Sequence, residues 1–462
     1  MLPQILSPKL CVHAYTINLY PPSSLKTPHS VAMSLKTNSR LYLGTNFSFE
    51  PKPQINPTNS SPNILIIGGG VTGLVTAWVL LDRGYHVTIV AKDWASYTKE
   101  QRLTSQIAGA LWEYPPAVCG QHTDIVSLAR SKHWCMLAYR VWEVIAADPN
   151  LSAAAGVQMK ESVFFFPYQI QDNAKQLGKL HELYRSGVRG VCRDPNLIHE
   201  HNINPSFGAV DAYKHLAPII DTDRCMTWLM ELVRCKGAEL ITETIYGDLF
   251  LQEDDLLSRF NADAIVNATG LASLETAGDP SCYPLRGALI RLINDGKDFP
   301  KITTAMSISA DAARDNEIVF LVPRNDNILV LGGVAQRDEW GLDLTLDSPV
   351  VKRMRKRCEA FIPSLKNARL DPEYPLAQGL RPGREENIRV EQETRRHKSL
   401  SGRSGSNCSR IFHSYGHGGS GWSLSFGCAD EIASLIEKTL YSRKSAGVTR
   451  VSADVPKIQS RL

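Results

Sequence analysis

The first strong apolar pattern along the chain begins at residue 64. The β-branched run at residues 64–67 (Ile-Leu-Ile-Ile) predicts a short strand that is buried on both faces. Three glycines follow, residues 74–83 predict a helix that ends at Gly84, and residues 86–90 predict a second strand. A strand, a glycine turn, a helix and a strand within roughly thirty residues form one βαβ unit.

Later segments alternate in the same way. Residues 222–235 predict a helix and residues 264–267 another buried strand. Strand-like runs predict a second, sheet-containing domain inserted into the first, and they lie at residues 163–166, 288–293, 318–322 and 328–331. The expected fold class is α/β, with a Rossmann-like first domain and an interleaved mixed-sheet second domain. A Gly-Ser stretch at residues 399–407 predicts a surface loop.

Residues 1–61 lack a comparable pattern. They are rich in Ser, Pro, Asn and Thr, and Glu50 is the one acidic residue among them. Such a composition buries little apolar surface, so we expect a disordered leader. Two alternatives stay open: a mitochondrial transit peptide, which is also basic and acid-poor, and a translation start at Met33.

The overall composition is that of an ordinary globular protein. Of the 462 residues, 43% are hydrophobic and 21% are charged, which excludes wholesale disorder and leaves room for two domains. Lys and Arg outnumber Asp and Glu by 51 to 47, but the two ends, residues 1–60 and 442–462, together carry +8. Residues 61–441 therefore carry −4, which argues against a nucleic-acid partner.

Neither a metal nor a membrane is expected. The ten cysteines are scattered without a Cys-x-x-Cys pair, as is usual in a reducing compartment. Cys119, His122, His133 and Cys135 come nearest to a zinc pattern, but the spacing of the second pair is wrong for a standard site. Residues 64–81 contain no charge, yet three consecutive glycines and two threonines weaken a membrane span.

The turn after the first strand carries a dinucleotide-binding motif. Gly68, Gly70 and Gly73 fit G-x-G-x-x-G between a predicted strand and a predicted helix. Glycine permits the tight turn, the approach of the pyrophosphate and the close packing of the helix, whose positive end faces the phosphates. Asp93 lies where the ribose partner is expected. This unit predicts a bound dinucleotide but does not distinguish NAD from FAD.

The segment at residues 411–429 has the most specific pattern in the chain. It contains His-Ser-Tyr-Gly at 413–416, further glycines at 418, 419, 421 and 427, and a closing Gly-Cys-Ala. It resembles the signature of the D-amino-acid oxidase family, which includes the D-aspartate oxidases. A glycine-rich turn between a strand and a helix offers backbone N–H groups and close approach to a flavin.

Other segments extend the resemblance over residues 63–440. Residues 91–93 are similar to the family's Ala-Arg-Asp step, and residues 103–112 to its loop around the pyrophosphate and flavin. The Ala-Thr-Gly turn at 268–270 resembles the one that returns the chain to the cofactor in two-domain flavoproteins. Residues 284–287 and 331–333 resemble family strand markers, and residues 379–384 the segment with the carboxylate-binding arginine.

The resemblance implies FAD as cofactor and a division of the chain. The FAD-binding parts would be about 62–125, 220–285 and 376–440, the substrate domain about 126–219 and 286–375, and the tail 441–462. The residues implied to bind the cofactor are Gly68, Gly70, Val71, Thr72, Gly73, Lys92, Asp93, Thr104, Ser105, Gly109, Ala110, Leu111, Ile245, Thr269, Gly270, Gly418, Gly419, Gly421, Trp422 and Ser423.

Three residues are implied for catalysis. Arg381 would hold the substrate carboxylate, because a guanidinium fork matches two carboxylate oxygens. The carbonyl of Gly419 would accept a hydrogen bond from the amine. Phe320 stands where the family has a tyrosine that donates to the carboxylate, and a second family tyrosine has no counterpart among residues 315–319. A lost hydrogen bond to a charged group costs about 1.5–3 kcal/mol, which argues against a free amino acid as substrate but not against the oxidase chemistry.

The leading hypothesis is oxidation of a D-amino acid by FAD and O₂, giving hydrogen peroxide. A tailoring oxidase for a larger amine and a non-catalytic flavin-binding scaffold are the alternatives. The residues Ser460-Arg461-Leu462 resemble the Ser-Lys-Leu address read by the peroxisomal import receptor, so we expect a peroxisomal enzyme. A homodimer stays open.

Overall fold

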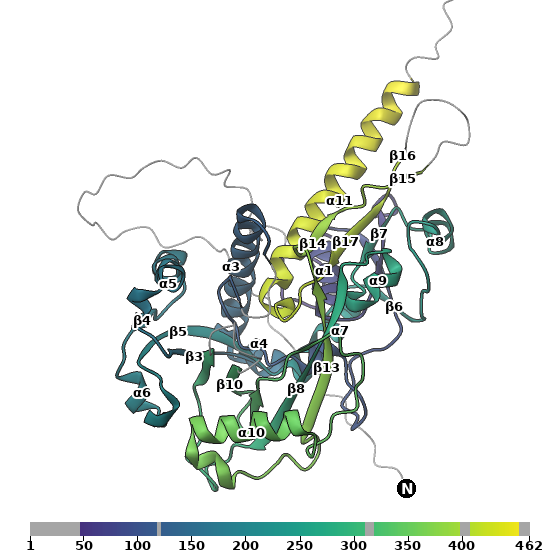
Figure 1. Ribbon diagram of the computed structural model, residues 1–462. Coiled ribbons are helices and arrows are strands. Elements are labelled where there is room, and N and C mark those ends of the chain that lie inside the picture. Colours follow the sequence, from purple (N-terminus) through teal and green to yellow (C-terminus); the bar gives the residue numbers. More distant parts are fainter. Residues whose placement is uncertain (1–46, 118–121, 310–317, 398–406, 452–462) are drawn as a thin grey trace, which may run out of the picture.

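The computed structural model describes residues 47–117, 122–309, 318–397 and 407–451, which are built around two large β-sheets (Figure 1). A short pair, β15 (Arg396–His397) with β16 (Asn407–Cys408), lies apart from them. The expected α/β fold class is confirmed. Most of the Gly-Ser stretch at 399–407 lies outside the described residues, as do residues 1–46 and 452–462.

The first sheet has six strands in the order β14-β17-β7-β1-β2-β6, and its neighbours are parallel except for β14 with β17. The central strands are buried on both faces because their side chains are apolar throughout, as predicted for residues 64–67 and 264–267. The strands are β1 (Asn63–Ile67), β2 (His86–Ala91), β6 (Glu239–Thr242), β7 (Ala264–Asn267), β14 (Arg389–Gln392) and β17 (Ile411–Tyr415).

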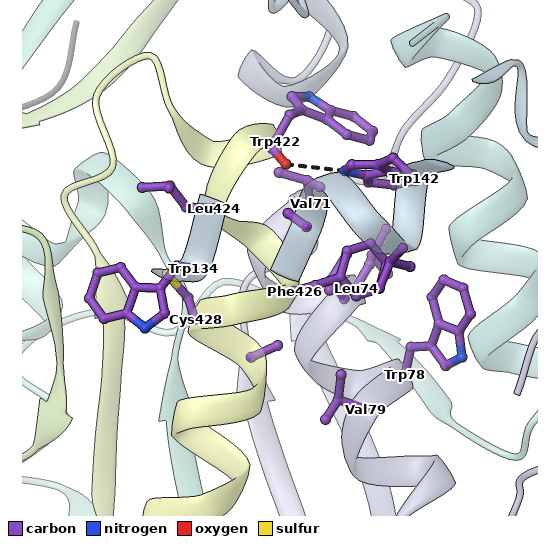
Figure 2. Packing of buried hydrophobic residues seen from close by; sticks show 14 of the residues in the cluster. Val71, Leu74, Trp78, Val79, Trp134, Trp142, Trp422, Leu424, Phe426 and Cys428 are labelled. Carbon is purple, nitrogen blue, oxygen red and sulfur yellow. Dashed lines mark hydrogen bonds between the residues drawn. The ribbon is translucent and has the colours of Figure 1, made fainter. Parts of the chain in front are cut away.

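Helix α1 (Val71–Asp82) connects β1 to β2 and is almost wholly buried, because it is apolar around its whole circumference. It packs against α11 (Gly421–Val451), which in turn packs against α3 (Ile125–Ala147). The ring of Phe426 contacts those of Trp78 and Trp142 at this junction, with centroid distances of 5.4 and 5.0 Å (Figure 2). The uncharged stretch at 64–81 is therefore a buried strand, a turn and a helix, and no helix of the described part of the chain is long and apolar enough to cross a membrane.

Residues 47–55 pack on α1, so the expectation of a disordered leader is wrong for this part of it. Phe47 stacks on Trp78 with 4.4 Å between ring centroids. The backbone N–H groups of Ser48 and Gln54 donate to the Asp82 carboxylate at 2.7 and 2.9 Å. The segment is polar on average, but its aromatic residues supply enough apolar surface to hold it in place.

The second sheet runs in the order β12-β8-β11-β10-β9-β3-β5-β4, and β13 pairs with β8 from the other side. Helix α10 (Pro349–Phe361) covers one face, and the other face looks toward α2 (Thr104–Ile107) and α3. The four strand-like runs predicted from the sequence are confirmed as parts of this sheet. Its strands are β3 (Val157–Phe166), β4 (Cys192–Arg193), β5 (Asp211–Ile220), β8 (Cys282–Ile293), β9 (Ala305–Ser309), β10 (Ile318–Pro323), β11 (Ile328–Gly332), β12 (Gln336–Arg337) and β13 (Leu376–Arg384).

One expected boundary differs from the structure. The division at residue 376 places β13 with the cofactor domain, whereas β13 pairs along its full length with β8 of the second sheet. The change of sheet therefore comes after Arg384. The remaining helices are α4 (Pro149–Ala155), α5 (Ala174–Ser186), α6 (Leu197–Glu200), α7 (Thr222–Cys235), α8 (Glu253–Arg259) and α9 (Ser273–Thr276), and α7 confirms the helix predicted over 222–235.

Candidate cofactor and substrate site

The glycine turn between β1 and α1 is enclosed by backbone atoms. A β-carbon at Gly68 would lie 2.3 Å from the carbonyl oxygen of Ala268, and one at Gly73 would lie 1.9 Å from the carbonyl oxygen of Gly68. Gly68 also has a φ of 123°, which L side chains rarely adopt. The turn therefore has the packing that the G-x-G-x-x-G motif requires, with the first N–H groups of α1 directly after it.

Ser105 connects this turn to two other segments predicted to bind the cofactor. Its hydroxyl accepts a hydrogen bond from the N–H of Val71 at 3.0 Å, and it lies 3.2 Å from where a β-carbon of Gly70 would be. Its carbonyl accepts a bond from the indole N–H of Trp422 at 2.8 Å. Three segments far apart in the sequence thus meet at the N-terminus of α1.

The loop around Ser105 contacts two strands of the second sheet. Thr104 donates its hydroxyl to the carbonyl of Leu380 on β13 at 3.2 Å, and Leu111 forms an isolated bridge with Ile219 of β5. Ala110 has a φ of 53°, an uncommon conformation for a residue with a side chain. Such conformations persist where the surrounding structure enforces them, which is common at binding sites.

The Ala-Thr-Gly turn after β7 lies beside β13. The hydroxyl of Thr269 donates to the Asn267 side chain at 2.8 Å, and this bond fixes the turn. A β-carbon at Gly270 would be 3.9 Å from the ring of Pro382, the residue after Arg381. The structure therefore brings the returning strand of the cofactor sheet next to the segment with the candidate carboxylate-binding arginine.

The glycine-rich segment between β17 and α11 also contacts that strand. Gly416 and Gly418 have φ values of 81° and 55°, and the N–H of Gly418 donates to the carbonyl of Pro382 at 2.8 Å. Gly419 is exposed. Gly421 begins α11 against Val71, whose methyl group is 3.7 Å from the position of a Gly421 β-carbon.

Arg381 and Phe320 lie over the same face of the second sheet. A β-carbon at Gly287 would be 2.1 Å from a terminal nitrogen of Arg381, so the guanidinium extends flat across β8. Its Nη1 donates to the carbonyl of Val334 at 3.2 Å. The ring of Phe320 covers Gly332 on the neighbouring strand β11. The arginine and the aromatic ring thus converge above two adjacent strands.

Phe320 also contacts the loop at residues 104–111, which we call the cofactor loop. A β-carbon at Gly109 would lie 2.7 Å from the Phe320 ring, which means that the ring rests on the backbone of this loop. The substrate-domain strand and the loop predicted to hold the flavin therefore touch directly.

The other predicted cofactor residues lie along the carboxyl edge of the first sheet or at helix starts. Lys92 and Asp93 follow β2 directly and are exposed, and Ile245 packs against the apolar cluster that contains Ile67 and Val90. This edge is where open α/β sheets bind ligands. Thr72 and Ser423 stand in the first turns of α1 and α11 and are half-buried.

His417 is a buried residue of the glycine turn whose environment the sequence pattern did not predict. Its Nε2 is buried and has no hydrogen-bond partner among the described residues. Burial lowers the pKa of His417 to about 4, so the imidazole is neutral at neutral pH. The sequence signal that could have indicated this environment is the position of His417 between two motif glycines.

A second unpredicted feature is a charged network around Asp279 at the end of β13. Arg384 donates to the Asp279 carboxylate at 2.8 Å, and the hydroxyl of Tyr415 on β17 does so at 2.8 Å. Burial raises the pKa of Asp279, but hydrogen bonds from Ser281, Arg384 and Tyr415 outweigh it and bring the pKa to about 2. The network fixes the strand that carries Arg381 against β17.

These residues fit a dinucleotide flavin. The glycine turn forms a cradle that side chains would fill, and the loop at 104–111 and the turn at 416–421 both adjoin it. The unpartnered Nε2 of His417 is a buried polar group of the kind that a bound ligand satisfies. Among the described residues, no group of His, Cys, Asp and Glu is placed to hold a metal, and Cys119 lies outside them.

A glycine cradle on a mostly parallel sheet, joined to a mixed sheet with an arginine across its inner face, defines a two-domain flavoprotein. The chain belongs to the family described as FAD dependent oxidoreductase, which matches residues 63–435. It is therefore an FAD-dependent oxidoreductase, and the resemblance and the cofactor expected from the sequence are confirmed.

Among similar proteins, a D-amino-acid oxidase of Rubrobacter xylanophilus is 30% identical over 373 residues, covering 80% of this chain and 94% of the relative. A D-aspartate oxidase of Talaromyces thermophilus is 24% identical over 404 residues, covering 83% and 97%. The crystal structure of glycine oxidase from Bacillus cereus has a TM-score of 0.58 at 16% identity, covering 82% of this chain and 96% of the other, which shows the shared fold.

Proposed function

We propose that this chain oxidises the amine carbon of a D-amino acid to an imine and reduces O₂ to hydrogen peroxide. The imine then hydrolyses to a 2-oxo acid and ammonia. The observation that carries the proposal is the placement of Arg381 across Gly287, on the same face of the second sheet as Phe320, whose ring contacts the cofactor loop. The names of the relatives in Rubrobacter xylanophilus and Streptomyces coelicolor support the same substrate class.

The residues would divide the work as follows. The turn at 68–73 would hold the pyrophosphate and Asp93 the ribose, while the loop at 104–111 and residues 418–423 would hold the flavin end. When bound, FAD supplies the two-electron redox chemistry. The bond to Val334 uses one of the five N–H donors of Arg381, so others remain for a bidentate carboxylate. The carbonyl of Gly419 would accept a hydrogen bond from the substrate amine, and the Phe320 ring would exclude water from the site.

The test is a substrate panel on the holoenzyme. Small, aromatic and acidic D-amino acids are compared with their L-enantiomers, and peroxide formation, O₂ uptake and anaerobic bleaching of the flavin are measured. We expect bleaching and peroxide with at least one D-enantiomer and none with its L-partner. A flavin that no D-amino acid bleaches would contradict the proposal.

Phe320 favours a second candidate function, a tailoring oxidase for a larger amine or amino-acid-derived metabolite. Because Phe320 has no hydroxyl, it gives a carboxylate no donor where the family's tyrosine does. This candidate predicts bleaching by N-substituted or bulky amines and none by free D-amino acids. A flavin that undergoes photoreduction but is bleached by no amine would instead support the third hypothesis, a non-catalytic flavin-binding scaffold.

We also propose a peroxisomal location through the import receptor. Ser460-Arg461-Leu462 resemble the receptor's address and lie outside the described residues, whereas α11, the last described helix, leads away from the two sheets (Figure 1). A compartment that contains peroxide suits the proposed reaction. A fluorescent protein fused in front of residues 443–462 should form catalase-positive puncta that disperse when Leu462 is deleted. A diffuse signal from the intact tail would contradict the location and leave the flavin chemistry untouched.

A further inference from the structure

Arg324 is a buried cation at the end of a strand of the second sheet. It binds the cofactor loop, residues 104–111, of the cofactor domain. It directly follows β10, the strand of Phe320, and the residue is 3% exposed. Its Nη2 donates to the carbonyl of Ala108 at 2.6 Å, and its Nη1 donates to the Thr222 hydroxyl and to the carbonyl of Gln106 at 3.4 Å. The Thr222 hydroxyl itself donates to the same Gln106 carbonyl at 2.5 Å.

All hydrogen-bond acceptors of Arg324 in the described part of the chain are uncharged oxygens, and its Nε has no partner there. Burial lowers the pKa of Arg324 to about 10, and the guanidinium is therefore still protonated at neutral pH. The carboxylates of Asp221 and Asp223 favour the charged form of Arg324 without bonding to it, and Asp223 is already paired with Arg102 and Arg291 at 2.8 and 3.4 Å. A buried charge is costly when its own partners are neutral, so packing alone does not account for this arginine.

The two carbonyls that Arg324 binds belong to residues next to Ser105 and Gly109, which make the contacts of the cofactor loop with α1 and with Phe320. Gln106 follows Ser105, whose hydroxyl accepts the first N–H of α1, and Ala108 precedes Gly109, on which Phe320 rests. In a trans peptide the C=O and the next N–H point in opposite directions. Holding the Ala108 carbonyl therefore directs the N–H of Gly109 away from Arg324.

We infer that Arg324 is a positioning residue for the flavin. It fixes the peptides from Gln106 to Gly109 and couples the strand of Phe320 to the loop that holds the cofactor. Thr222, the first residue of α7, completes the connection from the cofactor domain. The inference rests on FAD binding by this chain and is independent of which amine is oxidised.

The experiment titrates FAD into the apoprotein of Arg324→Met and Arg324→Lys and follows flavin fluorescence. We expect Arg324→Met to raise the FAD Kd at least tenfold and to reduce the fine structure of the flavin absorption band. Arg324→Lys should restore part of the affinity, because one ammonium reaches one carbonyl but lacks the fork. The matched control is Arg355→Met on α10, which loses bonds to Glu359 and to the Ala368 carbonyl and should leave the FAD Kd unchanged.

Melting of the apoprotein separates positioning from folding. A variant that melts earlier as apoprotein but binds FAD with the wild-type Kd and spectrum would overturn the inference. If Arg324→Met does not fold, Thr222→Val removes the bridging hydroxyl at nearly constant volume and should raise the FAD Kd severalfold, and an unchanged Kd would overturn it equally. These measurements use no substrate, so an inactive wild type that binds FAD tightly would contradict the proposed function alone.

Discussion

The ring of Phe320 occupies the space that a side chain at Gly332 would need: a β-carbon there would lie 1.9 Å from Cζ. Gly332→Ala should therefore displace the ring from the cofactor loop and from the neighbourhood of Arg381. Overpacking of this kind costs about 1–3 kcal/mol. We expect the free energy of unfolding in urea to fall by that amount and kcat/KM to fall at least tenfold.

The double variant Phe320→Ala/Gly332→Ala tests whether these two residues are coupled. The three atoms nearest to the added methyl group all belong to the Phe320 ring, so Gly332→Ala should cost far less in the Phe320→Ala background than in the wild type. Equal costs in both backgrounds would show that the ring moves away freely.

Gly70 tests the position of the phosphate turn. Gly70→Asp places a carboxylate beside Ser105 and the N-terminus of α1, where it competes with the pyrophosphate for the same N–H groups and repels its charge. We expect the purified variant to lack bound FAD. Gly178→Asp is the control, because its β-carbon points into open space on α5. A yellow Gly70→Asp protein with full FAD occupancy would refute this placement of the turn.

Arg381 tests the anchor of the substrate. Arg381→Ala leaves a desolvated carboxylate unpaired, which costs about 2–5 kcal/mol, so KM should rise at least tenfold for any carboxylate substrate. Arg381→Lys should reverse only part of the rise in KM, because an ammonium does not reproduce the planar fork of the guanidinium. The exposed Arg369, paired with Asp295 and Asp298, provides the control substitution Arg369→Ala. Unchanged kinetics in both Arg381 variants would favour the tailoring reaction.

The sequence predicted local structure well and contacts between distant segments poorly. The apolar runs of β1 and β7 and the glycine turn are visible in short windows, because burial on both faces and a tight turn each leave a local pattern. The packing of Phe320 on Gly109 joins residues more than 200 positions apart, and no local pattern encodes it. The resemblance to a family supplied Arg381, whereas the roles of His417 and Arg324 depend on burial, which a single sequence does not display.

The N-terminal segment was misjudged for a different reason. Composition averaged over residues 1–61 hides Phe47 and Phe49, whose ring centroids lie 4.4 and 5.7 Å from that of Trp78. Two aromatic side chains bury enough apolar area to order a short segment that is otherwise polar.

Acid should destabilise the protein partly through His215. Burial lowers the pKa of His215 to about 4, while an unfolded histidine titrates near 6.5. Between these values the unfolded chain binds a proton that the folded chain does not, so the free energy of unfolding falls by about 1.4 kcal/mol for each pH unit below 6.5. His215→Phe keeps the stacking on Phe164 and removes this proton.

The comparison is made by urea unfolding of the wild type and His215→Phe between pH 7 and pH 4.5. We expect the variant to gain stability relative to the wild type as the pH falls, with no relative change above pH 7. Parallel pH profiles would mean that His215 is protonated in the folded protein.

The ion pair between Asp82 and Lys236 ties the N-terminal segment to α1, and both side chains are fully buried with 2.7 Å between Oδ1 and Nζ. Asp82→Asn removes the charge that balances Lys236 and weakens the acceptor for Ser48 and Gln54, so it should cost about 3–5 kcal/mol of unfolding free energy. Asp82→Asn/Lys236→Met removes the stranded ammonium and should recover most of that loss.

Unfolding in urea can be followed by tryptophan fluorescence, because Trp78 donates its indole N–H to Asp82 at 3.1 Å. The exposed pair Glu231–Arg234 gives the matched control, since Glu231→Gln should change stability by less than about 1 kcal/mol. If the single and double variants at Asp82 were equally unstable, the loss would come from the hydrogen bonds to Ser48 and Gln54 and not from the unpaired charge of Lys236.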